Sequence, residues 1–373
     1  MEREERLTLP EPGWLTPAQA AEFFGQRLRS GATEVEFRTI DGSTGLTPVT
    51  TTRRGIAPSE VETPGGRERG FRCETTVSNS PGTTSVEWFD ARGVLVRMES
   101  DLGGMAMVLR ASTREEAERS GGGAEVMVST FVRPGRPIEG ARRLAYARYT
   151  LRATSGELPD LPMAGWQHVE RLDASRARVT VEDGAGGLAG EIDPAEYLRA
   201  TSALDGTDER VRELADRAVK GAGPGSLERA WALRAYVHRH IKRKDLSVAF
   251  ATASEVARSG EGDCSEHAML LAAMLRAQGI PSRVVAGLVY VDQFAGEEGV
   301  FGYHMWAQAL LGGEGGGGAR WVDLDATLGA TTDFDAAHIA LAASGMGEDE
   351  ALTGLASITP LLGRLEVEVE ESR

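Results

Sequence analysis

Apolar and polar residues alternate along much of the first half of the chain. Between residues 32 and 185, short segments place an apolar residue at every second position, which is typical of strands with one buried face. The turn DARG (90–93) between two of them favours a hairpin. The segments lie at 33–40, 71–77, 85–89, 94–99, 105–110, 125–131, 144–152 and 177–182. We therefore predict an antiparallel β-rich region here.

A helix is predicted before this region. Thr16 is a good N-cap, Pro17 suits the first helical position, and Gln19 completes a capping box. The helix should run to about Ser30 and stop at Gly31. A short helix over 112–120 (STREEAERS) is expected to interrupt the strands.

The pattern becomes helical beyond AGGLAGEIDPAEYL (185–198). One helix can be capped by Thr207 or Asp208, and a second follows PGS (224–226). A third, EHAMLLAAMLRAQ, is stopped by Gly279 with Pro281 just beyond. Strands are then expected at 282–291, 302–311 and 320–327, followed by a mixed, helical tail. The class is α+β, with a β-rich accessory domain and its N-terminal helix at 1–185, a second domain at 195–345 and a C-terminal tail at 346–373.

Composition and charge narrow the possible partners. The chain has 373 residues, enough for two or three domains, and a formal net charge of −15. That charge argues against nucleic acid or an anionic membrane surface as the main partner. The start, MEREERLTLPEPGW, has no apolar stretch, and no integral membrane segment is expected. As it stands the chain would be cytoplasmic, and an extracytoplasmic location stays open if the N-terminus was trimmed.

One of the two cysteines stands where a helix begins. Cys264, in GEGDCSEHAMLL, precedes an apolar helical run, and the unpaired N–H groups and dipole of a helix start favour a thiolate. A nucleophile also needs a proton acceptor and a group that orients it. His304 lies on a later expected strand and Asp325 on the next. If those strands are antiparallel neighbours, the two side chains face each other, and the pattern predicts a Cys-His-Asp triad.

Other interpretations of the same residue types must be weighed. A lone cysteine in an apolar context is usually a small buried residue, and this is the interpretation that we give to Cys73. Cys264, His267 and His304 could form a soft metal site, although a fourth ligand is not evident. No spacing argument supports a role for His338.

Three blocks in order carry a family resemblance. GDCSEHAMLLAAMLRAQGIPSRVV, then HMWAQA, then WVDLDAT resemble the bacterial transglutaminase-like domain, a member of the papain-like superfamily, over roughly 195–340. The resemblance implies a papain-like transglutaminase core, with Cys264 as nucleophile, His304 as base and Asp325 as orienting acid. Asp323 alternates onto the same face and competes with Asp325; the family match leaves it solvent-facing or as a partner of the site. Ala326 stands where many relatives have proline, and calcium dependence is not implied.

The resemblance implies acyl transfer through a thioester on protein or peptide substrates. Water as second nucleophile gives a peptidase or amidase, and an amine gives a transglutaminase; the triad does not distinguish them. Ser265, Tyr303 and Trp306 are expected in the substrate cleft, and no cofactor or metal is expected. The backbone N–H of Cys264 would serve as oxyanion donor. The alternative is a non-catalytic binding or scaffolding module that keeps this fold and uses the β-rich region as its interaction surface.

Overall fold

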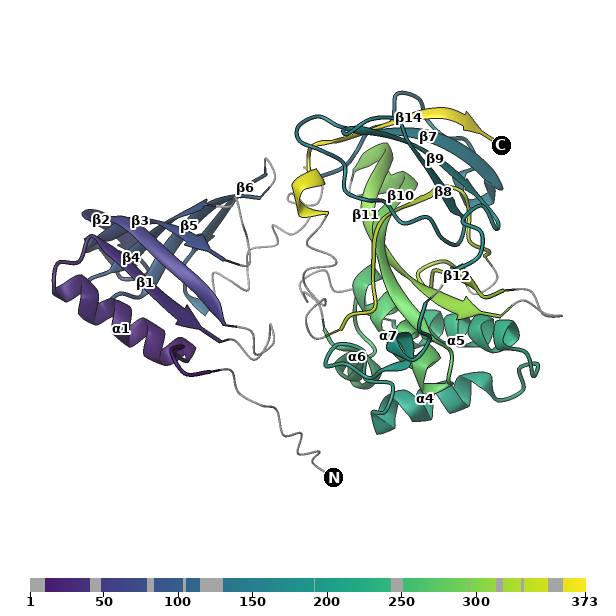
Figure 1. Ribbon diagram of the computed structural model, residues 1–373, viewed down its shortest axis with the longest axis horizontal. Helices are drawn as coiled ribbons and strands as arrows, with labels where there is room; N and C mark the ends of the chain where they lie inside the picture. Colours follow the sequence, from purple (N-terminus) through teal and green to yellow (C-terminus); the bar gives the residue numbers. More distant parts are fainter. Residues whose placement is uncertain are drawn as a thin grey trace. The chain divides into compact units, whose positions relative to one another are not determined.

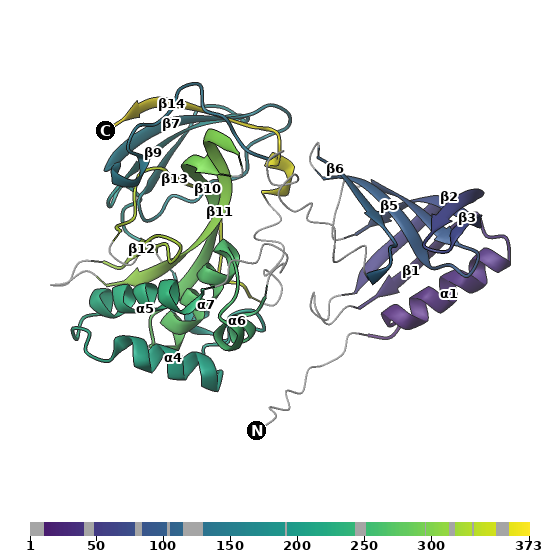
Figure 2. The same ribbon diagram turned by 180° about the vertical axis from the view of Figure 1, so that it is seen from behind.

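The computed structural model describes residues 11–40, 48–78, 84–102, 105–114, 130–190, 192–242, 251–294, 296–312, 318–329, 332–347 and 358–373. The chain divides into two compact units, unit 1 (Met1–Gly121) and unit 2 (Gly122–Arg373). Helices and antiparallel sheets occur in both (Figures 1 and 2). The predicted fold class, α+β with an antiparallel β-rich N-terminal region, is confirmed.

In its described residues, unit 1 consists of one helix on a six-stranded antiparallel sheet whose strands follow chain order. Helix α1 (Pro17–Arg29) has the predicted capping box, because Thr16 Oγ1 accepts the N–H of Gln19 and the Gln19 side chain accepts the N–H of Thr16. The strands are β1 (Glu34–Thr39), β2 (Val49–Thr63), β3 (Gly66–Val77), β4 (Thr84–Asp90), β5 (Leu95–Leu102) and β6 (Met105–Arg110).

Helix α1 lies along one face of this sheet (Figure 1). Phe24 and Leu28 pack there against Val35, Cys73 and Phe89, and all five are buried. The predicted helix at 112–120 and the predicted strand at 125–131 lie mostly outside the described residues.

Unit 2 contains four α-helices among its described residues. They are α4 (Glu209–Val219), α5 (Ser226–His240), α6 (Ala253–Ser259) and α7 (Cys264–Ala277), with the short 3₁₀ turns η1 (Ala141–Arg143), η2 (Glu196–Leu198) and η3 (Thr359–Leu361). Asp208 caps α4 and Asp263 caps α7. Helix α7 is the innermost, since every residue from Ala268 to Leu275 is buried.

Two four-stranded antiparallel sheets complete unit 2. The first has the order β12-β11-β10-β13, with β10 (Ser282–Phe294), β11 (Glu297–Leu311), β12 (Arg320–Leu324) and β13 (His338–Ser344). The second has the order β14-β7-β9-β8, with β7 (Tyr146–Ala153), β8 (Gln167–Arg171), β9 (Arg176–Glu182) and β14 (Leu365–Ser372).

The long hairpin β10–β11 takes part in two hydrophobic cores. Near one end, Val284 and Ala307 pack with the helices. Near the other end, Leu288 and Phe301 pack with the second sheet. Figure 1 shows the two strands running from the helices to β7 and β9. His304, paired with Gly287, stands where the strands pass from one core to the other.

The domain limits differ from those that the sequence suggested. The division falls between Gly121 and Gly122, so 130–185 lies in unit 2, with α4 to α7, rather than with β1–β6. The segment 346–373, expected as a mixed, helical tail, contains β14, which pairs with β7 through contacts such as Val367 opposite Leu151. Leu365, Val367 and Val369 alternate into the core and tie the chain end to this sheet.

Candidate active site

Cys264 is the first residue of α7, and the turn before it is tightly built. Asp263 Oδ1 accepts the N–H of Ser265 at 3.0 Å, and Glu266 Oε2 accepts the N–H of Asp263 at 3.0 Å. Gly262 has φ +147°, and a Cβ there would meet the Glu266 side chain at 2.2 Å, so only glycine fits. Cys264 itself stays partly exposed. The cap therefore places a partly exposed cysteine at a helix start.

The two residues after Cys264 belong to this cap. The Ser265 hydroxyl lies 2.9 Å from Asp263 Oδ1 and 3.0 Å from Glu266 Oε2, so its one donor hydrogen is used within the turn. Glu266 also accepts the N–H of Ala251 at 3.1 Å. Burial raises the pKa of the Glu266 carboxyl. Ser265, expected in the substrate cleft, thus has a visible part in shaping the helix start.

His304 and Asp325 are joined directly. His304 on β11 places Nε2 at 2.9 Å from Asp325 Oδ2, directly after β12. Both side chains are buried. Asp325 Oδ1 accepts the backbone N–H and the hydroxyl of Thr327, each at 2.7 Å. Both oxygens of the carboxylate are therefore held, Oδ1 by Thr327 and Oδ2 by the imidazole of His304.

Cys264 completes the group. Burial alone would lower the pKa of His304, but the charge and hydrogen bond of Asp325 and a hydrogen bond with Cys264 raise it to about 10. Because Nε2 is engaged by Asp325, Nδ1 is the ring nitrogen left for the sulfur. Burial works against the charge of Asp325 as well, yet His304 and His338 hold the pKa of that carboxyl well below its usual range. At neutral pH the site pairs an imidazolium with a carboxylate.

An arginine from α5 fixes the backbone around Asp325. Arg234 is 1% exposed, and its Nε donates to the carbonyl oxygen of Asp325 at 2.7 Å. Another of its nitrogens donates to the carbonyl oxygens of Gly329 and Thr332, at 2.9 and 2.7 Å. These bonds close the turn that follows β12. The sequence offered no signal for this role, because Arg234 lies within an ordinary helical pattern.

Trp306 and Asp323 lie behind His304. The Trp306 ring is nearly parallel to that of His304, with centroids 6.1 Å apart, and its Nε1 donates to Asp323 Oδ1 at 2.7 Å. Asp323 also accepts Gln308 Nε2 at 2.7 Å and the N–H of Trp166 at 2.9 Å. Asp323 is 3% exposed, so it is a buried partner of the site and not a solvent-facing residue.

The packing of Trp306 depends on a glycine, Gly287, on the neighbouring strand β10. A Cβ at Gly287 would lie 2.7 Å from the Trp306 ring and 2.1 Å from the carbonyl oxygen of Ile339. Trp306 itself is 1% exposed. It therefore supports the histidine from within the core. Tyr303, the other expected cleft residue, donates its hydroxyl to the carbonyl oxygen of Leu361 at 3.0 Å.

The structure does not bring Cys264, His267 and His304 together as a compact group of potential metal ligands. His267 Nδ1 lies 2.5 Å from the carbonyl oxygen of Asp263, within the cap. Within the described ranges, one group of three histidine or acidic side chains has potential ligand atoms that all lie within 4.8 Å of one another: His304, Asp325 and His338. His338 is the residue that sequence reasoning missed.

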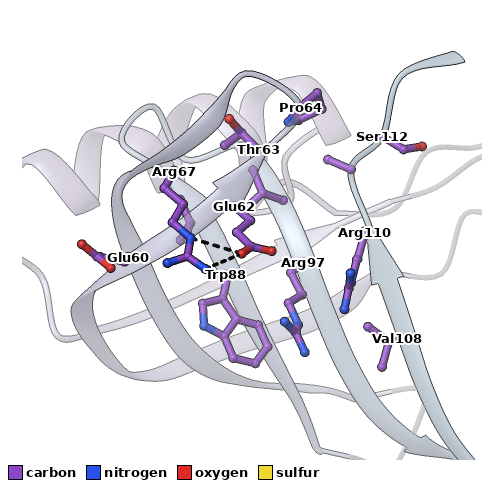
Figure 3. Close-up of a pocket in the computed structure, with 13 residues that line it drawn as sticks. Glu60, Glu62, Thr63, Pro64, Arg67, Trp88, Arg97, Val108, Arg110 and Ser112 are labelled. Carbon is purple, nitrogen blue, oxygen red and sulfur yellow. Dashed lines mark hydrogen bonds and ion pairs between the residues drawn. The ribbon is translucent and has the colours of Figure 1, made fainter. Parts of the chain in front are cut away.

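Unit 1 carries a separate hollow of about 950 Å³. Register aligns Arg72, Trp88, Arg97 and Arg110 across β3 to β6 on the face opposite Phe89. Figure 3 shows Trp88, Arg97 and Arg110 around this hollow. Its lining contains neither cysteine nor histidine, so it has no pair of nucleophile and base.

Comparison with known proteins identifies the region around Cys264. Residues 212–326 match the family model of the transglutaminase-like superfamily. This match supports cysteine-based catalysis in general. No curated protein matches the chain. None of the described helices is long and apolar enough to cross a membrane.

Solved structures give only distant overlaps. A candidate cysteine protease from Cytophaga hutchinsonii is 13% identical, with a TM-score of 0.36, and the match covers 61% of this chain and 85% of that one. The periplasmic domain of TgpA from Pseudomonas aeruginosa, bound to ethylmercury, is 18% identical with a TM-score of 0.35, covering 56% and 93%. At such TM-scores the overlaps carry no argument about function.

Proposed function

We propose that the transglutaminase-like domain of this chain catalyses acyl transfer on peptide or carboxamide substrates through a thioester on Cys264. His304 is the general acid and base, and Asp325 orients its ring. The reaction is hydrolysis when water takes the acyl group, and transamidation when an amine does. The substrate is a protein or peptide.

The first half of the reaction uses a charged pair. The Cys264 thiolate, favoured beside an imidazolium and at a helix start, attacks the carbonyl carbon. The carbonyl oxygen becomes an oxyanion, and the backbone N–H of Cys264, in the first turn of α7 where helix N–H groups lack an intrahelical partner, serves as its donor. His304 then gives its proton to the departing amine, the C–N bond breaks, and the acyl group stays on sulfur as a thioester.

The second half returns the proton. Neutral His304 takes a proton from the incoming water or amine, which attacks the thioester and releases the sulfur as a thiolate. Asp325 keeps its charge throughout and stabilises the imidazolium each time it forms. The single observation that best supports the proposal is the 2.9 Å bond between His304 Nε2 and Asp325 Oδ2, with Cys264 as the further hydrogen-bonding partner of the same ring.

Alkylation of the two cysteines tests the proposal without a known substrate. Iodoacetamide is applied over a range of pH, and each site is quantified by mass spectrometry in wild type, His304→Ala and Cys264→Ala. Cys264 should be alkylated selectively near neutral pH, and this preference should be lost in His304→Ala. Cys73 is 1% exposed and serves as the internal reference. Slow alkylation of Cys264, equal to that of Cys73 and insensitive to His304, would contradict an assembled triad.

A second candidate function is a binding module. The observation that favours it is the hollow of unit 1, in which Trp88 lies within reach of the Arg97 guanidinium, 5.1 Å from its ring centroid. A pure binding module has no need of a reactive Cys264, so the alkylation result separates the two. If Cys264 is reactive, peptides with and without an added amine then distinguish hydrolysis from transamidation.

A further inference from the structure

His338 is a buried histidine next to the triad. It begins β13, and its side chain is fully buried. The Phe334 ring stacks on it with centroids 4.3 Å apart, and the Trp306 ring meets it edge-on at 5.5 Å. Its Nε2 lies 3.3 Å from Asp325 Oδ2, the same oxygen that His304 contacts. Asp325 Oδ2 therefore lies between two imidazole rings.

The neighbours of His338 determine where its protons are. Nδ1 lies 3.0 Å from Asp335 Oδ1 and 3.2 Å from the carbonyl oxygen of Asp335. A carbonyl oxygen only accepts, and Asp335 Oδ1 already accepts the N–H of Ala337 at 3.0 Å, so Nδ1 must carry a proton. A neutral ring would then point the bare lone pair of Nε2 at the Asp325 carboxylate. The contact is attractive only if Nε2 is protonated as well.

We propose that His338 is a permanent imidazolium that positions Asp325, and through it His304, for the reaction of Cys264. The inference rests on the proposed function, because His338 acts on that site. His338 touches neither the sulfur nor the acyl group in this mechanism, so it is a positioning residue. Two carboxylates, Asp325 and Asp335, neutralise it from opposite sides.

The surrounding charges alternate in sign. Arg142 from η1 lies 3.2 Å from Asp335 Oδ2, on the far side of that carboxylate from His338. From the ring beside Cys264 the row is His304 imidazolium, Asp325 carboxylate, His338 imidazolium, Asp335 carboxylate and Arg142 guanidinium, so that each member lies next to a group of opposite sign. Each buried charge thus has an opposite neighbour, the condition under which burial is tolerated. Burial by itself would lower the pKa of His338, and the two carboxylates raise it.

This arrangement has a consequence for the reaction. Thr327 holds Asp325 Oδ1, and His338 holds Oδ2 in line with His304. His338 stays charged while His304 gives up and regains its proton. Its positive charge keeps the pKa of the Asp325 carboxyl low, so that Asp325 does not take that proton. The ring of His304 then keeps one orientation through both halves of the reaction.

Nitrogen NMR of the full chain, with ¹⁵N-labelled histidine rings, tests the charge directly. The sequence has six histidines, and His338→Gln identifies the signal of this one by its loss. Both His338 nitrogens should stay protonated between about pH 7 and pH 8, which lies above the ordinary histidine pKa of about 6.5. In Asp335→Asn the ring should lose a proton at lower pH than in wild type. A neutral His338 with a bare Nε2, or zinc bound in wild type and lost in His338→Gln, would overturn the proposal.

Alkylation of Cys264 tests the positioning. His338→Phe keeps a ring against Phe334 but removes both protons, and should slow alkylation about tenfold. His338→Gln keeps a donor near Nε2 and should recover part of that rate. His168→Gln, at an exposed histidine of β8, is the control and should react like wild type.

The outcomes separate the two proposals. If the alkylation rate of Cys264 depends on His304 but not on His338, the proposed triad stands and the proposed role of His338 is overturned. If that rate depends on neither histidine, the proposed function is contradicted, whatever charge NMR finds on His338. If His338→Phe does not fold, Asp335→Asn supplies the same comparison of protonation and alkylation rate.

Discussion

Buried charges serve different ends in the two units. In unit 1, Arg53 Nε lies 3.1 Å from Glu87 Oε2, and the Thr75 hydroxyl donates to the same oxygen at 2.7 Å. The Arg53 guanidinium also lies 4.2 Å from the Phe24 ring centroid. This is a closed pair: the two opposite charges neutralise each other, and neither is directed toward a reactive group. In unit 2 the charges form a row that ends beside Cys264, a residue that is partly exposed.

The two cysteines show what the difference means. Cys73 belongs to the closed cluster of unit 1, with Sγ 3.8 Å from Thr75 Oγ1, and burial raises the pKa of its thiol. All six histidines lie between residues 168 and 338, so unit 1 contains none. A cysteine becomes reactive through a histidine beside it and access to solvent. Cys264 has both, and Cys73 has neither.

The largest expected effect is on the rate of acyl transfer, and it distinguishes Asp325 from Asp323 in unit 2. Asp325→Asn should lower the rate of the acyl transfer by about 10⁴-fold, because an amide cannot hold the imidazole in the same tautomer or stabilise its charge. Asp323→Asn keeps the one acceptor oxygen that Trp306 and Gln308 share and loses the acceptor for the N–H of Trp166, and it should change that rate by less than about tenfold. Turnover of the best peptide amide is the measurement, with circular dichroism to verify folding. Equal losses in both variants would contradict the assignment.

The sequence predicts elements well where the signal is local. The cap of α1 at Thr16 and the start of α7 after Asp263 depend on neighbouring residues, and both occur as expected. Strand β2 was missed because Gly55 and Pro58 interrupt its alternation; the register shift between Arg54 and Ala57 absorbs the break. Strand β14 does alternate, but its partner β7 lies more than 200 residues away in the chain. Pairing at that distance leaves no local trace.

The same limit applies to the candidate site. Cys264, His304 and Asp325 stand in sequence blocks that suggest chemistry, and Thr327 belongs to the last of these blocks. His338 and Arg234 carry no such mark. Each reaches Asp325 only because a separate element, β13 or α5, passes close to the end of β12. Residues that support a site through folding contacts are therefore invisible in one sequence.

A smaller effect is expected from breaking the closed pair of unit 1. Glu87→Gln leaves the largely buried Arg53, whose side chain is 16% exposed, without its counter-charge and should cost about 3 kcal/mol in the free energy of unfolding of that unit. Cys264 should be alkylated at the wild-type rate. Glu62→Gln is the matched control, since its pair with Arg67 is exposed and should contribute at most about 1 kcal/mol. Urea unfolding gives both values. A slower alkylation of Cys264 in Glu87→Gln would break the contrast between the units.

The smallest effect concerns the response of each unit to alkaline pH. A raised folded-state pKa means that the folded chain holds the proton longer than the unfolded one. The stabilisation from His304 is then complete below about 6.5, the ordinary value for histidine, and is lost as pH rises toward a pKa of about 10. His338 acts in the same direction. Burial lowers the pKa of His240, so its contribution changes below 6.5, outside this window.

In unit 1 the corresponding loss begins only near the ordinary pKa of the cysteine thiol, 9.0, through Cys73. Between about pH 6.5 and pH 8.5, unit 2 should therefore lose on the order of 1–2 kcal/mol while unit 1 loses almost none. Hydrogen exchange of the full chain, corrected for the intrinsic rate at each pH, reports β3 and β11 separately in one sample. His304→Gln should reduce the slope in β11, leaving the part due to His338, and should leave β3 unchanged. A slope of equal size in both units, or a slope in β11 that is as steep in His304→Gln as in wild type, would mean that the His304 imidazolium does not link the folding of unit 2 to pH.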